Sequence, residues 1–205
     1  MPFIKRDPAA PAEQTPDDPT AQIAGLESPD AQARWSAARA LGGDPDAVPA
    51  LAAALAREHV PRVREAIMTG LMRVGDEASV LVLLPYLRSQ DAGQRGTAIE
   101  ALQALPEAIL PFMPKLLADG DSDVRILATE LVRNIPAKDA TRVLCGLIEH
   151  EQHPNVCAAA IDVLAEVGTR DAIPALKACA ERFSNTPFVP FAVSITMARI
   201  SDAEG

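Results

Sequence analysis

A motif that recurs about every thirty residues constrains the fold of this chain more than any other feature. One column of the motif holds Arg in four repeats and other residues in the last two: Arg34, Arg64, Arg95, Arg125, Cys157 and Pro190. Successive members of this column are 30, 31, 30, 32 and 33 residues apart. A repeat of this period is typical of a solenoid, in which each unit packs only on its neighbours and function lies on the surface.

The columns just before the Arg column predict where a helix begins in each unit. Four residues before it stand Asp30, Val60, Asp91, Asp121, His153 and Thr186. The Asp and Thr side chains can accept a hydrogen bond from a free amide of the first helical turn. The next column contains Pro61, Pro154 and Pro187, and proline is tolerated at the first helical position because its missing N–H costs nothing there.

Apolar residues after the Arg column follow the spacing of one helix face. They stand at plus three, four, seven and ten, as in Ile67, Met68, Leu71 and Val74. Gly or Pro at plus eleven ends most of these helices, whereas the first unit ends early, at Gly42. A second apolar segment precedes each helix, over 47–55, 80–87, 109–117, 141–148 and 172–183. Each unit is therefore predicted to be a helical hairpin.

The expected architecture is an all-α, right-handed α-solenoid of about six helical hairpins, spanning residues 20–201. The units are expected at about 20–43, 44–75, 76–106, 107–136, 137–168 and 169–201. Residues 1–19 hold five prolines and few core-forming side chains, which indicates a flexible arm. This arm is interpreted as a solvated tail, with a short docking peptide as the alternative.

Three segments carry a resemblance to a known family: residues 28–41 (SPDAQARWSAARAL), 47–55 (AVPALAAAL) and 120–132 (GDSDVRILATELV). They resemble HEAT repeats, and are most similar to the short-repeat subgroup named after phycobilin lyases. The resemblance covers about nine tenths of the chain. It implies that the second helices line the concave side. Phycobilin lyases attach or detach a tetrapyrrole on a Cys of an antenna protein and usually act as two-subunit complexes.

Composition excludes several classes of function. A net charge of −9 and a pI near 4.8 oppose binding to nucleic acid, which requires clustered Lys and Arg. Cys145, Cys157 and Cys179 have no CxxC spacing and are expected to be small buried residues. The chain shows neither a signal-peptide pattern nor an apolar run long enough for a membrane span, so a cytoplasmic protein is expected.

The Arg column has two interpretations. Four guanidinium groups at a regular pitch could bind the carboxylates or phosphates of a ligand. The resemblance instead implies that Arg34, Arg64, Arg95 and Arg125 bond loop carboxylates and carbonyls of adjacent units. Asp30, Asp91 and Asp121 stand four residues before three of them. We expect this structural ladder.

No convergent catalytic set is recognisable in the sequence. His150, Glu151 and His153 form an HExH cluster, one residue short of the HExxH pattern that places two zinc ligands on one helix face. We interpret the cluster as a solvated loop, with a weak metal site as the alternative. No nucleophile elbow or phosphate-binding loop is present. The chain is therefore expected to have no catalytic residue, metal or cofactor.

Positions of the second helices that packing does not require predict a partner-binding groove. The candidate residues combine acidic and isolated apolar side chains: Trp35, Arg39, Glu65, Thr69, Met72, Glu100, Ile126, Glu130 and Asp162. This composition suits a protein partner with a basic or partly apolar segment. The alternative is an ordinary solvated face. Trp35 is either a packing residue over the open end of the first unit or a contact anchor.

The last helix, expected from Pro187 to Ile200, is apolar around most of its circumference. Terminal repeats normally present a polar outer face. Phe188, Phe191 and Ile195 are therefore expected to dock a partner or a second copy of the chain, as in a homodimer. The alternatives are that this unit belongs to a longer solenoid or that it folds onto its own last loop.

Two functions remain from these observations. The first is a non-enzymatic protein-interaction or scaffold module, which the absence of a catalytic set favours. The alternative is a subunit of a bilin lyase-like enzyme acting on a tetrapyrrole-carrying protein, which the resemblance favours.

Overall fold

The computed structural model describes residues 18–202, so nearly all of the predicted N-terminal arm lies outside the described residues. The described chain contains helices and no strand. The helices pair as α1 (Pro19–Gly25) with α2 (Ala31–Leu41), α3 (Val48–Arg57) with α4 (Pro61–Val74), α5 (Glu77–Leu83) with α6 (Ala92–Gln103), α8 (Met113–Leu117) with α9 (Ser122–Leu131), α10 (Ala137–His150) with α11 (Pro154–Val167), and α12 (Ile173–Arg182) with α13 (Phe188–Asp202). The predicted all-α solenoid of helical hairpins is confirmed.

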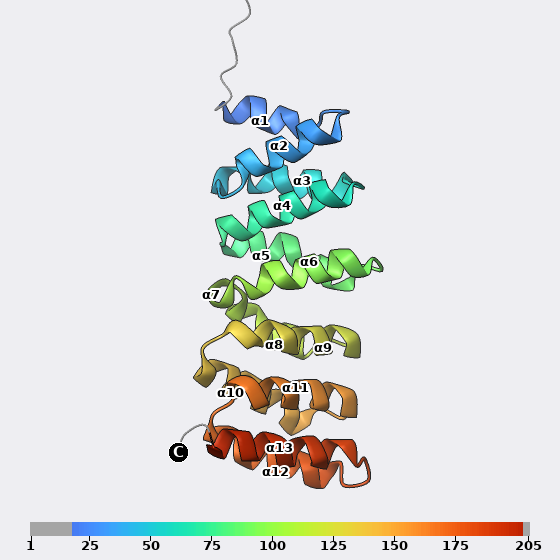
Figure 1. Ribbon diagram of the computed structural model, residues 1–205, viewed down its shortest axis with the longest axis vertical. Helices are drawn as coiled ribbons and strands as arrows, with labels where there is room; N and C mark the ends of the chain where they lie inside the picture. Colours follow the sequence, from blue (N-terminus) through green and yellow to red (C-terminus); the bar gives the residue numbers. More distant parts are fainter. Residues whose placement is uncertain (1–17, 203–205) are drawn as a thin grey trace, which may run out of the picture.

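The hairpins stack in two layers along the long axis of the molecule (Figure 1). One layer contains α2, α4, α6, α9, α11 and α13, each in contact with the next. We call it the second-helix layer, and its outer surface the second-helix face. The other layer contains the first helix of each hairpin, such as α3, α10 and α12. Because each unit contacts its neighbours, the apolar residues form one continuous core.

Small side chains allow the helices of the first two units to approach closely. A Cβ on Gly70 in α4 would lie 3.2 Å from Cα of Gly42, the residue that caps α2. Leu51, Ile67 and Leu71 fill the core around this contact and are fully buried. At the end of α4, Gly75 adopts a φ of 73°, a left-handed conformation that glycine reaches without steric cost.

Prolines interrupt the first helices of the third and fourth units, where the apolar pattern predicts continuous segments over 80–87 and 109–117. Pro85 lies in a 3₁₀ segment, η2 (Leu84–Arg88), and Pro111 in another, η3 (Leu110–Phe112), which follows the short α7 (Pro106–Ile109). A proline lacks the N–H that an α-helix needs, so the chain tightens at these points. The remaining 3₁₀ segments are η1 (Pro45–Ala47), η4 (Val132–Asn134) and η5 (Arg170–Ala172).

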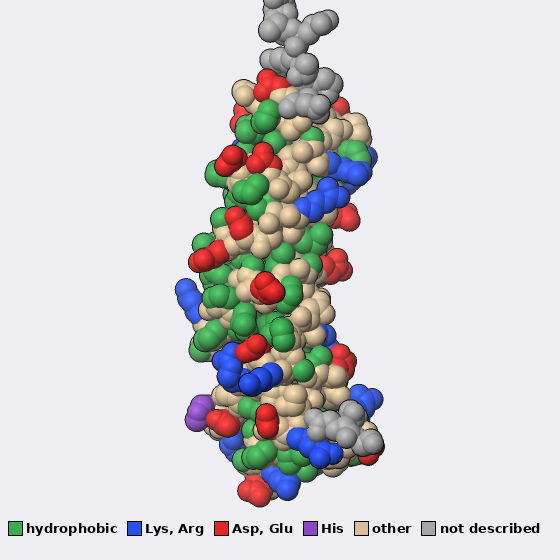
Figure 2. Space-filling view, turned by 90° about the vertical axis from the view of Figure 1, so that its left-hand side faces the viewer, with side chains coloured by type: hydrophobic (Ala, Val, Ile, Leu, Met, Phe, Trp, Pro, Cys, Tyr) green, Lys and Arg blue, Asp and Glu red, His purple; other side chains and the backbone are tan. Residues whose placement is uncertain are grey.

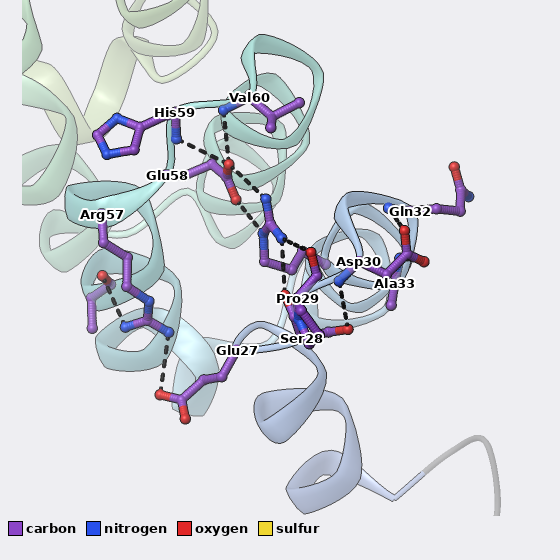
Figure 3. A network of polar contacts seen from close by, with 12 residues as sticks. Glu27, Ser28, Pro29, Asp30, Gln32, Ala33, Arg57, Glu58, His59 and Val60 are labelled. Carbon is purple, nitrogen blue, oxygen red and sulfur yellow. Dashed lines mark hydrogen bonds and ion pairs between the residues drawn. The ribbon is translucent and has the colours of Figure 1, made fainter.

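Arg34 joins the loops of two successive units. Its Nε lies 2.7 Å from Oε2 of Glu58, and a second guanidinium nitrogen donates to Oε1 at 3.1 Å. A third nitrogen donates to the carbonyl of Ser28, in the loop before its own helix, at 2.9 Å. Figure 3 shows Glu58 facing the Ser28 loop across this network. A planar guanidinium suits this bidentate pairing, which fixes both the distance and the orientation of the two loops.

Arg125 repeats this arrangement in the fourth unit. It contacts Glu151 through two nitrogens, at 2.7 and 3.1 Å, and donates to the carbonyl of Asp119 at 2.7 Å. Glu58 and Glu151 lie in corresponding places, each two residues before an N-cap residue whose side chain makes no capping hydrogen bond. We call each of these Arg–Glu arrangements a loop pin.

Each glutamate of a loop pin also accepts backbone N–H groups of the loop just before the next helix. Glu58 accepts the backbone N–H groups of His59 and Val60, at 3.0 and 2.8 Å. The hydrogen bond from Arg34 lowers the pKa of Glu58 to about 2, against burial, and the Val60 amide acts in the same direction. Burial opposes ionisation of Glu151, but the hydrogen bonds from Arg125 and the His153 amide hold its pKa below the usual value. Both carboxylates are therefore charged at neutral pH.

The other ladder residues depart from this arrangement. Arg64 donates to the carboxylate of Asp91 in the next unit, at 3.0 Å. For Arg95 the hydrogen bond shown among the described residues is to the carbonyl of Ser89, at 2.6 Å. Arg88, which the repeat does not predict, pairs instead with Asp119 and lies 4.0 Å from Asp121.

The aspartates of the ladder act mainly as N-caps. Asp30 caps α2, Asp91 caps α6 and Asp121 caps α9, each through a side-chain oxygen that accepts a backbone N–H of the first turn. Within the described chain, the side chain of Asp30 forms no hydrogen bond to Arg34, although Asp30 stands four residues before it.

A different arginine serves the loop after α10. Cys157 occupies the Arg column there, with its Sγ 3.8 Å from the carbonyl of Glu151. Arg182, at the end of α12, donates to the carbonyls of Ile148 and Glu149 in the last turn of α10. A cation at a helix C-terminus satisfies free carbonyls and complements the helix dipole.

We expect Glu58→Gln to lower the free energy of unfolding by about 2 to 3 kcal/mol at neutral pH, because the variant loses a carboxylate whose pKa is depressed in the folded state. A carboxylate with a lowered pKa stabilises the fold fully above its ordinary pKa of 4.5, and this contribution disappears as the pH falls towards about 2. Urea unfolding at several pH values measures the difference, which should shrink over that interval.

Glu27→Gln is the matched control. Glu27 is also paired, with Arg57 at 3.3 Å, but its side chain is 73% exposed. Exposed pairs contribute little to stability, so this variant should unfold like the wild type. A Glu58→Gln protein as stable as the Glu27→Gln protein would contradict the role of the loop pin.

Candidate functional site: the second-helix face

Shallow pockets lie where neighbouring helices of the second-helix layer meet. One lies between α2 and α4, one between α4 and α6, and one between α11 and α13. Another lies between the start of α9 and the chain that leads into α6, residues 87–90, with Arg95 of α6. Figure 2, which shows one long side of the stack, shows hydrophobic side chains along its length with single acidic and basic groups between them. The pockets differ in chemistry from one end of the second-helix face to the other.

The pocket between α2 and α4 is aromatic and basic, and we call it the Trp35 pocket. The half-buried Trp35 carries two guanidinium groups on its ring, with the Arg62 and Arg39 carbons 4.3 and 4.7 Å from the ring centroid. Arg73, Glu65 and Thr69 also line the pocket, whose volume is about 220 Å³. Trp35 thus packs partly on the core and partly forms this surface. The sequence pattern missed Arg62 and Arg73.

The opposite half of the second-helix face is acidic and centred on Arg133. Arg133 lies 2.7 Å from Glu130 and 3.0 Å from Asp162, and it also pairs with Glu166. The hydrogen bond from Glu130 contributes most to raising the pKa of Arg133, so the guanidinium stays charged. One arginine among three carboxylates leaves an excess of negative charge there. The sequence analysis missed Arg133, although its spacing of three residues from Glu130 is a recognisable helical ion pair.

The remaining predicted groove residues are spread between these two regions. Glu65 and Glu100 are exposed, while Met72 and Ile126 are half-buried and pack against the core. Ile126 also lines the pocket of about 430 Å³ at the start of α9. The structure therefore does not gather the candidate residues into one site.

The last helix exposes the apolar residues singled out in its sequence. Phe188, Phe191 and Ile195 are 46%, 66% and 42% exposed, whereas Val189 and Val193 on the other side of α13 are buried. Phe191 and Ile195 line the pocket between α11 and α13. Among the described residues, no further unit packs against this surface.

Two of the three cysteines lie next to each other in the core. Cys157 and Cys179 are buried, and the hydrogen bond between their thiols lowers the pKa of Cys179 and raises that of Cys157. The positive charge of Arg182 acts on Cys179 in the same direction. Cys145 is half-buried, and burial raises its pKa to about 11. The sequence offered no spacing from which this contact between α11 and α12 could be deduced.

The three side chains of the HExH cluster do not converge, because Glu151 belongs to a loop pin. Glu151 points to Arg125, while His150 ends α10 and His153 is the N-cap residue of α11. Within the described residues, no group of three His, Cys, Asp or Glu side chains is placed to hold a metal ion. No helix in that part of the chain has the length and hydropathy needed to cross a membrane.

Comparison with solved structures gives relatives of the fold. An archaeal HEAT-like repeat protein from Thermococcus onnurineus NA1 is 15% identical, with a TM-score of 0.54 over 90% of this chain and 87% of that protein. The complex of CpcE and CpcF of phycocyanin lyase from Nostoc sp. PCC7120 contains a chain that is 19% identical, with a TM-score of 0.41 over 97% of this chain and 100% of that one. At these identities the likeness concerns the fold alone.

A relative in sequence bears on function. The bilin biosynthesis protein PecE of Mastigocladus laminosus is 34% identical over 150 residues, which are 71% of this chain and 55% of that protein. The chain thus spans about half the length of the relative. The expectation that the chain is not an enzyme is wrong on this finding, because the relative belongs to bilin biosynthesis.

The repeat pattern itself also matches a known family. The family model of HEAT repeats matches residues 20–103 and 109–186, which include five of the six hairpins almost entirely. The stacked hairpins, the loop arginines and this match agree. The chain belongs to the HEAT repeat family.

Proposed function

We propose that this protein is a subunit of a bilin lyase-like enzyme that acts on a tetrapyrrole-carrying protein. The identity of 34% over 150 residues to a bilin biosynthesis protein carries this proposal. A general scaffold has no comparable support, because HEAT repeats are shared by proteins of many functions. In such an enzyme the chain has two tasks that its own surface can perform, which are to bind the protein substrate and to position the pigment.

The acidic half of the second-helix face suits the protein substrate. Glu130, Asp162 and Glu166 surround one arginine, and Glu100 is exposed on α6, which packs against α9. This excess of carboxylates attracts a basic segment and orients it before contact. Arg133 holds three of the carboxylates in place, so the surface is ordered before the partner arrives.

The apolar end of the solenoid suits a second subunit. Phe188, Phe191 and Ile195 form an exposed apolar patch on the terminal helix. A second copy of this chain is the simplest occupant, because two identical α13 helices can meet about a two-fold axis and cover each other's patch.

Binding of a bilin tests the proposed function. The purified protein, incubated with biliverdin and passed through a gel-filtration column, should elute with visible absorbance in the protein fraction. Bovine serum albumin and an unrelated designed solenoid serve as positive and negative controls for the column. A colourless protein fraction at every pigment concentration would show that the proposed function is wrong.

The state of assembly tests the apolar end separately. Light scattering should give twice the chain mass of 21.7 kDa for the wild type and the single mass for the double variant Phe188→Asp with Phe191→Asp. Leu81→Asp is the matched control, since Leu81 is 54% exposed on α5, away from α13. A wild-type monomer, or a dimer that survives the double variant, would rule out association through α13.

A further inference from the structure

We propose that the Trp35 pocket binds the carboxylate groups of the bilin. The inference rests on the proposed function, and it assigns the pigment to one place on the second-helix face. A bilin is an open-chain tetrapyrrole, which combines a conjugated apolar body with propionate carboxylates. A site for it needs cations that are free to bond, an aromatic or apolar surface, and room for a flat group to approach.

The charge of the Trp35 pocket is unusual for this protein. Three arginines and one glutamate line it, in a chain whose net charge is −9. The side chains of Arg39 and Arg73 form no hydrogen bond or ion pair with any residue that the structure describes. By contrast, Arg34, Arg125 and Arg133 each bind at least one carboxylate at 2.7 Å. The Trp35 pocket therefore carries uncompensated positive charge.

Trp35 holds two of the cations without consuming their donors. The ring of Trp35 attracts the Arg39 and Arg62 guanidinium groups through its π electrons, at 4.7 and 4.3 Å. Arg62 also donates one hydrogen bond to Gln32, at 2.8 Å. A guanidinium has five N–H donors, so most of those on Arg39 and Arg62 stay available to a carboxylate. The two cations are ordered before a ligand binds, which reduces the entropic cost of binding.

The pocket between the arginines is open to solvent. Its lining includes Ala66 and Gly70, whose small side chains follow from the close approach of α2 and α4. A volume of about 220 Å³ is enough for the carboxylate side of a tetrapyrrole but not for the whole molecule. The remainder of the pigment would lie along the second-helix face, accessible to the protein that receives or releases it.

Biliverdin and its dimethyl ester distinguish this site from general adsorption of an apolar pigment. The two compounds share the conjugated body, and only the acid carries charge. Titration followed by visible circular dichroism, which a bilin acquires when a protein fixes its twist, should give the acid at least a tenfold lower Kd than the ester. The double variant Arg39→Gln with Arg73→Gln should bind the acid at least tenfold more weakly than the wild type does.

Lys138→Gln with Arg142→Gln is the matched control. It removes the same charge from the exposed surface of α10, in the other layer, and should bind the acid like the wild type. Both double variants replace exposed side chains, and thermal unfolding verifies that each is folded.

The outcomes separate the pocket from the proposed function. If the wild type binds the acid and the ester equally, or if Arg39→Gln with Arg73→Gln binds the acid like the wild type, the pocket assignment is wrong while bilin binding stands. If the wild type binds neither compound, the proposed function fails as well. A loss confined to the pocket variant, together with weak binding of the ester, supports the site.

Discussion

The bond from an arginine near the start of a second helix to the loop of the next unit is the interaction on which the rest of the structure depends. Each unit buries little apolar surface by itself, so the solenoid exists only if successive units stack in one register. Arg34 and Arg125 set that register by joining a carbonyl of their own loop to a carboxylate of the following loop. The same carboxylates accept the backbone N–H of the N-cap residue of the next helix, so one contact fixes the spacing and the orientation of the loops and the conformation of the chain that enters that helix.

Much of the fold could be predicted because each structural requirement recurs at the same position of successive repeats. The Asp and Pro columns indicated helix starts, and the apolar positions indicated the buried faces. The partners of the arginines were harder to find. Glu58 and Glu151 stand two residues before the N-cap slot, in a column with Ser28, Ser89 and Asp119, and each of these side chains accepts the N–H two residues later. That column was visible in the sequence, but its role depends on a loop conformation that periodicity does not reveal.

Other features could not be predicted because they arise between units. Arg182 in α12 donates to the carbonyl of Ile148 in α10, 34 residues away in the sequence. It thus provides an arginine contact in the unit where the Arg column contains Cys157. Arg62 and Arg39 meet on Trp35 only because α2 and α4 pack side by side. The candidate groove residues were chosen from single columns, which contained Arg39, Glu130 and Asp162 but not Arg62, Arg73 or Arg133. Function was harder still to predict, because the repeat pattern specifies the shape of the surface but not its chemistry. The similarity to a bilin biosynthesis protein provided the indication of function that the repeat pattern did not contain.

The unequal distribution of charge along the second-helix face has a directional consequence. Its N-terminal part presents guanidinium groups around Trp35, and its C-terminal part presents carboxylates around Arg133. A substrate that carried an anionic pigment at one point and a basic segment at another would match this face in only one orientation, since the reversed pose places like charges together. The charge distribution along the solenoid would then orient the substrate before close contact forms, and so determine at which end of the second-helix face the pigment binds.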